Sequence, residues 1–590
     1  MPKSKPPPRF EKDWGGNGRA IGRMTSSGRQ STGAFAGILS ATGLAVCVIV
    51  VALVEEMGLP ETITYYAVVG GALAAAAAFG LSAPTMRLAD YFAAGRSAGA
   101  FHNGLAMVAG LAFLAFFGVT SLDFTADGDG AVLILGPTIG ILIAGLLIAP
   151  AVRRTGALTV PEYLAGRLGG SFVRPVALLV LVAAGGPLLA ALMMAFGRLA
   201  SYFVAISYGA AVFVAVVAIL AATILGGARG LLRSLSVQFL ILFVAYLLPP
   251  VLLAVREYGL PAPAFLVGQT LHALGQESGA PVDAAPEVVR SAADSLRYIA
   301  LVVWLALGAA ALPHLLTPAI ALREAHLTRK SVAWATVFCI VLFTVAPGYA
   351  VFARLTDIGI FALPKITGMP FFLIALLVAG GLAALTAAAA GLALALANAI
   401  GHDLYYSFVD RRAPQGRRLV IARLLLIAVA ALAAWFAVSS DTPPMPLAAL
   451  SFSFAAAGLL PALIATAWWP RATALAVAAG MAVGALGASA YVLAARLYGV
   501  DLSGAIGLAR LGNPEMAAAF FGLPLGVIVL AALGQFMPRR PIAVTTEPAA
   551  AGEEPAAPPA EEAAEPAVMQ ARLAPRRPNL ALIRNRLLRR

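Results

Sequence analysis

Residues 89–110 read ADYFAAGRSAGAFHNGLAMVAG, a stretch in which charged, polar and glycine residues lead directly into an apolar run. It carries Asp90, Arg96, His102 and Asn103, although the surrounding chain consists mostly of Ala, Leu and Val. Membrane helices begin in this way, because polar groups stay in the loop while the residues that follow must match the hydrocarbon. This stretch therefore predicts a loop that opens a membrane helix near residue 103.

The composition of the whole chain predicts its fold class. Of its 590 residues 61% are hydrophobic and only 12% are charged, whereas a soluble chain of this length needs far more polar surface. Apolar runs of about 18 residues or more recur, and each is long enough to cross the hydrocarbon core as a helix. Strands are disfavoured, because the runs do not alternate and an open sheet edge cannot face lipid. We expect an all-α polytopic membrane protein.

The apolar runs predict about fourteen transmembrane spans of helical length. Their approximate ranges are 33–54, 62–83, 103–121, 131–150, 175–199, 206–227, 234–255, 296–316, 331–355, 370–398, 418–438, 444–468, 473–496 and 515–536.

The basic residues predict the orientation of these spans. Most of the 41 Lys and Arg residues share one side of the membrane once the N-terminus is placed in the cytoplasm, as the positive-inside rule requires. We expect both termini in the cytoplasm and a multi-pass protein of the inner membrane. Residues 1–32 are then a basic cytoplasmic segment, and residues 33–61 an extra N-terminal transmembrane helix with its loop. The net charge of +13 follows from this topology, so no nucleic-acid partner is expected.

The end of the chain differs in composition from the rest. Residues 537–590 contain the low-complexity run TTEPAAAGEEPAAPPAEEAAEPA, which cannot bury a core and predicts a disordered cytoplasmic tail. The tail closes with NLALIRNRLLRR. Two interpretations stay open for this segment: a short basic helix on the anionic inner leaflet of the lipid bilayer, or a solvated basic end.

Five stretches, in order along the chain, carry a family resemblance. ADYFAAGR followed by FHNGLAM resembles the entry to the first core helix of the sodium:solute symporter family, and is most similar to its acetate/monocarboxylate (cation/acetate symporter) permease branch. The other four stretches are TVPEYLAGRLG, GGARGLLRSLSVQFLILFVAY, LPHLLTPAIALREAHLTRKSVAWATVF and AGLALALANAIGHDLYYSF. The resemblance covers about residues 62–536.

The resemblance implies a leucine-transporter-type fold. Its core would be two five-helix repeats of opposite orientation, 103–255 and 296–468, preceded by the helix 62–83 and followed by two trailing helices within 473–536. The predicted span 33–54 is then an addition to the family domain, 62–536. Such repeats place solute and ion near the bilayer midplane, at helices that are broken there.

The resemblance also implies an ion site between two helices. Val108 and Leu111 fall where the family offers backbone carbonyls to sodium, and the expected hydroxyl positions fall on Ala387 and Ala388. Thr386 carries the nearest hydroxyl. Sodium is a hard cation that needs several oxygen ligands, so this divergence predicts weak or absent sodium dependence. The ion-binding candidates are Val108, Leu111, Ala384, Thr386, Ala387 and Ala388.

The substrate-site candidates lie on the helices predicted at 103–121 and 296–316. Gly110 permits a break, because glycine tolerates unusual backbone angles, and Phe113 follows it; the alternative is an ordinary packed helix. Pro313 removes a backbone donor and can free a carbonyl. His314 could serve a proton path, or could simply bond a neighbouring carbonyl. Trp304 completes the set.

Four further residues are expected to act structurally at the cytoplasmic side. Asp90, Arg96, Asn103 and Asp403 belong to the quoted inner-loop motifs and lie where spans meet the cytoplasm. Hydrogen bonds and ion pairs from such residues hold loops and helix ends.

The sequence thus predicts a secondary active transporter, with no enzymatic activity, that moves a small organic solute by alternating access. A monocarboxylate such as acetate is the expected cargo, and a cation drives it. The alternatives are a degenerate sensor or partner subunit that no longer transports, and a permease coupled to protons or to nothing. No cofactor is expected besides sodium or a proton as coupling ion, and no metal site beyond sodium. A small membrane partner subunit is left open.

Overall fold

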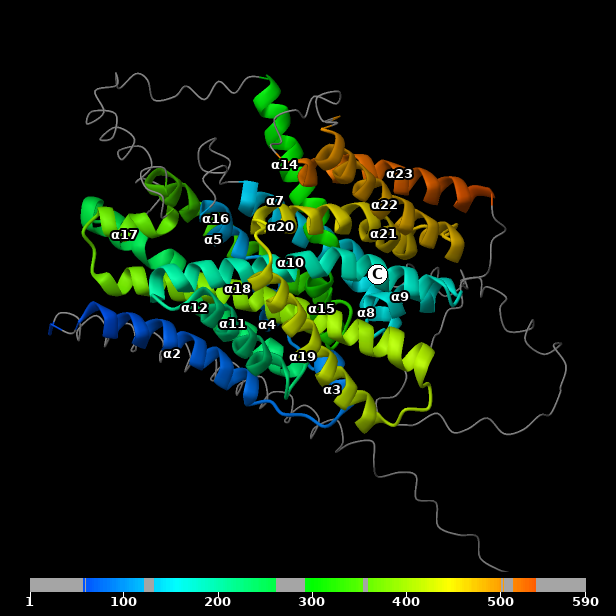
Figure 1. Cartoon of the computed structure of the whole chain (residues 1–590), viewed down its shortest axis with the longest axis horizontal. Helices are drawn as coiled ribbons and strands as arrows, with labels where there is room; N and C mark the ends of the chain where they lie inside the picture. The colour runs from blue at the N-terminus through cyan, green and yellow to red at the C-terminus, as the bar shows by residue number, and fades with distance from the viewer. Residues whose placement is uncertain are drawn as a thin grey trace, which may run out of the picture. The chain divides into compact units, whose positions relative to one another are not determined.

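The computed structural model describes residues 57–58, 60–120, 132–261, 292–353, 359–499, 502 and 513–536. The chain divides into two units, residues 1–548 and 549–590, and every described residue lies in the first. The described part is helical throughout (Figure 1). Its β-structure is a single isolated bridge, in which Ala98 pairs with Leu322.

The first half of the described chain supplies a leading helix and a set of core helices. They are α2 (Glu61–Leu81), α3 (Leu88–Ala93), η1 (Ala94–Arg96), α4 (Ala100–Ala109), α5 (Phe113–Thr120), α7 (Val132–Ile143), η3 (Ala144–Ile148), α8 (Ala149–Thr155), α9 (Val160–Leu168), α10 (Val173–Val204), α11 (Tyr208–Thr223) and α12 (Ala228–Tyr258).

The second half of the described chain supplies the remaining helices. They are α14 (Ala292–Ala311), α15 (Pro313–Ala321), α16 (Leu327–Ala353), η6 (Gly359–Phe361), α17 (Ala362–Ile366), α18 (Phe371–Ala399), η7 (Ile400–Val409), α19 (Gln415–Ser439), α20 (Pro444–Phe454), η8 (Ala455–Leu459), α21 (Leu460–Trp468), α22 (Ala474–Tyr498) and α23 (Pro514–Phe536).

The helices bear out the all-α prediction for a membrane protein. Among the described residues, 9 helices are long and apolar enough to cross a membrane, or up to 10 if the bent pair α14–α15 is one span. Every predicted span after residue 61 falls on a helix or a broken helix. The predicted span 33–54 lies outside the described residues, as does the tail after residue 536. A total of about fourteen spans therefore stays a prediction.

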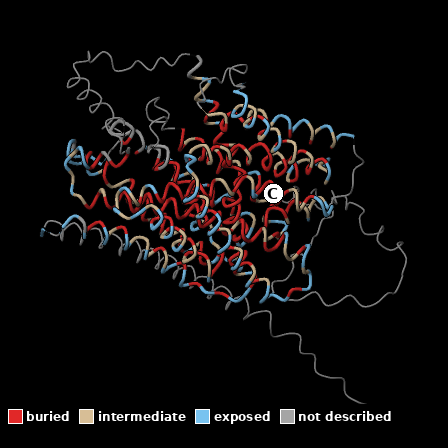
Figure 2. The backbone as a smooth tube through the Cα atoms, viewed as in Figure 1, coloured by how far each residue is buried: buried red, intermediate tan, exposed pale blue. Residues whose placement is uncertain are grey.

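Helix α18 forms the centre of the bundle. In its most apolar window 89% of the residues are buried, whereas the figure is 28% for α2 and for α19. The residues of α18 are mostly alanine, leucine and glycine on every side of the helix. A helix that is apolar all round belongs in a core. The buried segments in Figure 2 gather in the middle of the bundle, while α2 has a large exposed share. Helices α2, α10, α12 and α19 all contact α18.

Arginine side chains join the loops at one end of the bundle. Arg423 donates to the backbone carbonyls of Thr85 at 2.8 Å and of Ile224 at 2.9 Å. Arg153 donates to the carbonyl of Leu322 at 2.5 Å. Guanidinium groups suit this task, because each one presents several donors to carbonyls that no helix uses. We call this region, where the loops near residues 85–99, 156–172, 224–229 and 322–326 meet, the inner-loop end.

A buried carboxylate connects two distant segments at the inner-loop end. Asp403 in η7 is fully buried, and its Oδ2 accepts a hydrogen bond of 2.6 Å from the Thr159 hydroxyl. Its Oδ1 lies 3.6 Å from Nε of Arg174 at the start of α10. Thr159 is also the N-cap of α9, where its hydroxyl accepts from the N–H of Glu162. One side chain thereby caps a helix and anchors η7.

Next to Asp403 in the chain, His402 joins a second group of polar side chains with Glu162 and Arg418. Glu162 Oε1 lies 3.1 Å from His402 Nε2, and Arg418 Nη2 lies 3.0 Å from His402 Nδ1. Burial alone would raise the pKa of Glu162, but His402, the N–H of Leu158 and Arg174 together hold that pKa below its ordinary value. The carboxylate is therefore ionised at neutral pH, and it ties α9 to η7 and α19.

Loss of the Asp403 charge should destabilise the fold. Asp403→Asn keeps the bond from Thr159 but removes the ion pair with Arg174, whose guanidinium then keeps the Ser407 hydroxyl as acceptor; this loss should cost about 2 kcal/mol. Asp410→Asn is the matched control, because its ion pair with Arg417 is exposed and should be worth less than about 1 kcal/mol. Thermal unfolding in detergent, followed by tryptophan fluorescence, should show a midpoint several degrees lower for the Asp403 variant. Equal midpoints for the two variants would show that the buried pair contributes nothing.

Candidate functional site

The first core helix is broken in its middle. Helix α4 ends at Ala109 and α5 begins at Phe113, with a turn between them. The N–H of Leu111 donates to Val108 at 3.0 Å, and that of Leu114 donates to Leu111 at 3.0 Å. Each bond reaches back three residues where a regular α-helix reaches back four. The carbonyl of Gly110, which Leu114 would have taken, is thereby available outside the helix.

A second helix breaks opposite the first. Helices α14 and α15 meet at Leu312 with a bend of 47°, and Pro313 begins α15 without an N–H to donate. His314 follows in the first turn of α15, and its Nε2 lies 3.0 Å from the carbonyl oxygen of Gly110. The two breaks therefore meet at one hydrogen bond.

Glycine suits the α4–α5 break because His314 and Leu315 lie close to it. A Cβ at position 110 would lie 3.1 Å from Cδ2 of His314 and 3.3 Å from Cδ2 of Leu315. Both distances are tighter than ordinary van der Waals contact. A larger residue would require the side chains of His314 and Leu315 to shift by a few tenths of an ångström.

His314 presents its second nitrogen to the protein interior. The carbonyl of Gly110 can only accept, so Nε2 carries the hydrogen and Nδ1 holds a lone pair. The residue is buried, and Nδ1 has no hydrogen-bond partner within the described part of the chain. An imidazole in this state can receive a proton, or a hydrogen bond from an O–H or N–H of a bound molecule.

Segment 382–390 of α18 lies beside this crossing. Phe116 of α5 packs against Gly381, and His314 packs against Gly391, so the segment between the two glycines faces both broken helices. Thr386 is buried there, and its hydroxyl donates to the carbonyl of Leu382 in its own helix. The α18 candidates therefore lie on a segment flanked by contacts to both broken helices, but they offer few side-chain oxygens. The candidates Ala384, Ala387 and Ala388 are buried without side-chain oxygens.

The candidate carbonyls of the α4–α5 break already accept hydrogen bonds. The Val108 oxygen accepts from Leu111 and from Ala112, at 3.0 and 2.8 Å, and the Leu111 oxygen accepts from Leu114. A carbonyl has two lone pairs, so the Val108 oxygen has used both. A cation at this point would have to displace one of these bonds.

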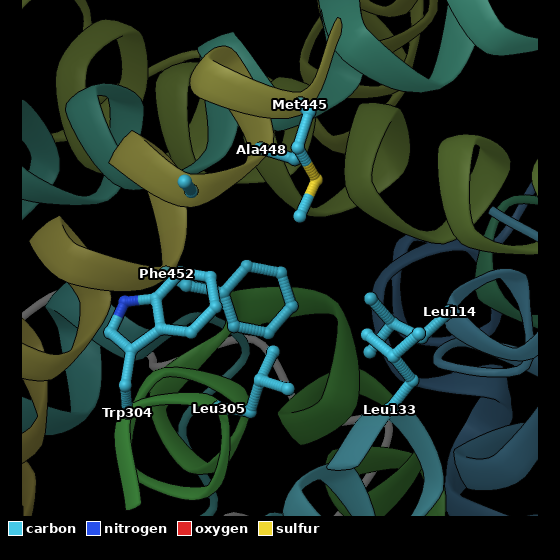
Figure 3. A pocket seen from close by; sticks show the side chains of 8 residues that line it. Leu114, Leu133, Trp304, Leu305, Met445, Ala448 and Phe452 are labelled. Atoms are coloured by element: carbon cyan, nitrogen blue, oxygen red, sulfur yellow. The ribbon is translucent and has the colours of Figure 1, made fainter. Parts of the chain in front are cut away.

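Trp304 lines a small apolar void between α5, α7, α14 and α20. The void measures about 10 Å³, room for one group the size of a water molecule or a methyl. Figure 3 shows the rings of Trp304 and Phe452 on one side of it and Leu114 and Leu133 on the other. Its full lining is Leu114, Leu133, Trp304, Leu305, Met445, Ala448, Ala449 and Phe452. The candidate Phe113, which precedes Leu114, is also buried, but it does not line this void.

A second void of about 20 Å³ lies along α15, towards the inner-loop end. Pro313, Thr317, Thr159 and Asn398 contribute to its lining. Asn398 is buried, and its Oδ1 has no hydrogen-bond partner among the residues described. One void thus follows α14 and the other follows α15, with the break between them.

The remaining motif residues lie at the inner-loop end or close to it. Asp90 Oδ2 accepts from the Thr85 hydroxyl at 3.2 Å and from Arg229 at 3.4 Å. Arg96 donates to the carbonyl of Gly156. Asn103 is buried in α4, and neither of its amide atoms has a partner within the described ranges. None of the three reaches the crossing of the broken helices through a hydrogen bond that the structure records.

Several site residues could not have been identified from the sequence. Met445, Phe452 and Leu133 line the void but are ordinary apolar residues in apolar helices. Asn398 is the exception, because a polar amide inside an apolar run is a signal that could have been followed. Within the described residues, no group of three or more His, Cys, Asp or Glu side chains could hold a metal ion.

Two of the curated proteins that match this chain align with it over most of their own length. An uncharacterised symporter of Cupriavidus necator is 26% identical, over 78% of this chain and 90% of its own length. A monocarboxylic acid transporter of Corynebacterium glutamicum is also 26% identical, over 66% of this chain and 75% of its own length.

A solved structure supports the fold independently. A Na⁺-coupled sialic acid symporter in a substrate-bound, outward-open state matches with a TM-score of 0.62, over 82% of this chain and 99% of its own. The sequences are 16% identical, so this likeness concerns the fold.

A family model also matches this chain. It describes sodium:solute symporters and matches residues 91–484, more than half of the chain. The resemblance predicted from the five motifs is confirmed, and so is the prediction of a secondary active transporter of a small organic solute rather than an enzyme. This multi-pass membrane protein belongs to the sodium:solute symporter family.

Proposed function

We propose that the protein moves a small monocarboxylate, such as acetate, across the inner membrane by alternating access, and that solute and coupling ion bind where the two broken helices cross. The observation that carries this proposal is the hydrogen bond between His314 Nε2 and the carbonyl of Gly110. Transporters of this architecture bind their cargo at such breaks, where backbone groups leave the helix. The name of the Corynebacterium glutamicum relative supports the cargo class.

The positions of the two breaks support the inverted-repeat organisation. The α4–α5 break falls in the first helix of the proposed repeat 103–255, and the α14–α15 break falls in the first helix of the proposed repeat 296–468. Two discontinuous helices at corresponding positions are the usual sign of a binding site at a repeat interface. The extra helix at 33–54, the cytoplasmic termini and the disordered tail belong to the same proposal, on the distribution of basic residues and the composition of the tail.

The coupling ion is proposed from the oxygens around the crossing. Ala387 and Ala388 offer no hydroxyl, the Thr386 hydrogen is bonded within α18, and the Val108 carbonyl accepts twice. A sodium ion would depend on too few ligands for its hard-cation chemistry. His314, by contrast, holds a buried lone pair beside the break. We therefore assign the coupling to a proton at His314 Nδ1, with sodium at most a weak effector.

The sodium assignment is tested with purified protein in proteoliposomes. Uptake of labelled acetate should follow an imposed proton gradient and respond weakly or not at all to sodium. The pair Ala387→Ser and Ala388→Thr should strengthen any sodium response, because it adds two oxygens where the ion would lie. Ala393→Ser, also on buried α18, is the matched control and should change nothing. Saturable sodium-driven uptake that survives Thr386→Ala unchanged would refute this site.

The proton assignment is tested with variants that separate the roles of the two His314 nitrogens. His314→Gln keeps an N–H that can reach the carbonyl of Gly110 and an oxygen that accepts hydrogen bonds, but it removes the basic nitrogen that can be protonated. Proton-driven accumulation should fall by roughly tenfold or more, the effect of losing one interaction of ~1.4 kcal/mol, while solute exchange without a gradient continues. His314→Leu removes both functions and should lose exchange as well. Full proton-driven accumulation by the glutamine variant would contradict the assignment.

A further inference from the structure

A chain of hydrogen bonds runs from the apolar void to the two trailing helices. Trp304 Nε1 donates to the hydroxyl of Ser453 at 3.0 Å, and that hydroxyl donates to the backbone carbonyl of Glu515 at 2.5 Å. The Glu515 carboxylate in turn accepts from Arg496, through Nε at 3.0 Å and Nη2 at 2.8 Å. The chain therefore connects α14, α20, α23 and α22.

The direction of each bond in this chain is fixed by chemistry. An indole N–H can only donate and a carbonyl can only accept. The single hydrogen of Ser453 must therefore go to Glu515, and its lone pair must receive Trp304. Trp304 and Ser453 are both buried, so an indole N–H without this acceptor would be left unpaired in an apolar interior, which is unfavourable. The hydroxyl thus holds the indole ring in one orientation.

The Glu515 carbonyl that accepts from Ser453 belongs to a tightly packed pair of helices, α22 and α23. Helices α22 and α23 lie side by side (Figure 1) and approach closely at glycines, since a Cβ at Gly522 would lie 2.5 Å from the carbonyl of Gly484. Such close approach of small residues is how helices associate in lipid. The Arg496–Glu515 pair locks the outermost turn of α23 to α22, with the carboxylate largely buried. The carbonyl that holds Ser453 is therefore fixed by both trailing helices.

The opposite side of the indole faces the void. Figure 3 shows the ring nitrogen on the side away from Leu114 and Leu133, so the carbon edge of the ring borders the empty space. The Phe452 ring lies beside it, with centroids 5.7 Å apart. All eight lining side chains are apolar, so the void suits the hydrocarbon end of a solute and not its charged end.

We propose that this void is the subsite for the apolar tail of the monocarboxylate, and that Ser453 is a positioning residue that fixes its depth by holding Trp304. This inference rests on the proposed function and names the part of the substrate that the void selects. The space accepts one methyl-sized group, and a longer tail requires the Trp304 ring to turn. The trailing helices, which lie outside the two repeats, thereby set the chain length that the protein prefers.

The test compares two buried serines of α20. Ser453→Ala removes the acceptor of Trp304, whereas Ser451→Ala removes a buried hydroxyl that has no hydrogen-bond partner in the described structure. Uptake of labelled acetate into proteoliposomes is competed with straight-chain monocarboxylates of increasing length. The Ser453 variant should bind butyrate better relative to acetate by about tenfold, as expected for roughly two buried methylenes. The Ser451 variant should keep the natural ratio.

Two further variants separate positioning from general structural damage. Ser453→Thr keeps the hydroxyl and should keep the natural chain-length ratio. Met445→Ala enlarges the void from the other side, and its shift towards longer tails should add to that of Ser453→Ala. The same ratio in the natural protein and in Ser453→Ala, or an unchanged ratio in Met445→Ala, would overturn this inference alone. Failure of the natural protein to take up any monocarboxylate would overturn the proposed function together with it.

Discussion

The hydrogen bond between His314 and the carbonyl of Gly110 organises the centre of this protein. Inside a bilayer every backbone polar group must find its partner within the protein, so a broken helix is tolerated only where another element satisfies it. Here each break meets the other: Gly110 releases a carbonyl, and Pro313 places His314 where its Nε2–H can bond that carbonyl. The absence of a side chain at Gly110 leaves room for the His314 ring, which also packs against Gly391 of α18. This hydrogen bond satisfies the polar groups of the two breaks, so the surrounding helices can be apolar.

The charges of the chain are arranged by the same constraint. At the inner-loop end, Arg153 and Arg423 donate to backbone carbonyls of loops that no helix satisfies. The buried Asp403 is acceptable because Thr159 and Arg174, more than two hundred residues earlier in the chain, reach its carboxylate. This explains the polar stretch at residues 89–110, where Asp90 and Arg96 bind loops while Gly110, a few turns later, opens the site. Loop anchoring and the proposed solute site therefore occupy opposite parts of one short segment.

The predictability of each feature depends on how local its cause is. The spans follow from long apolar runs, and the freed carbonyl near Pro313 from a residue that acts on its own backbone, so residue type predicts both. The break at Gly110 is expected from the family resemblance, with an ordinary packed helix as the alternative. The missing hydroxyls at Ala387 and Ala388 could also be seen in advance, but the bond of Thr386 to its own helix could not. The chain from Trp304 through Ser453 to Glu515 joins residues 149 and 62 positions apart. No sequence pattern marks such a pairing, because it depends on how α14, α20 and α23 pack.

The central claim is that His314 keeps Nε2 for the α4–α5 break and offers Nδ1 to the transported species. Nitrogen-15 NMR of the histidine-labelled protein in lipid measures this directly, with His314→Gln identifying the signal. In the absence of solute the account predicts a neutral ring protonated at Nε2, with an Nδ1 signal typical of a bare lone pair. Addition of acetate at low pH should shift the Nδ1 signal towards the protonated form and leave Nε2 protonated. A ring protonated at Nδ1 from the start, or an Nδ1 signal that ignores both acetate and pH, would contradict the account.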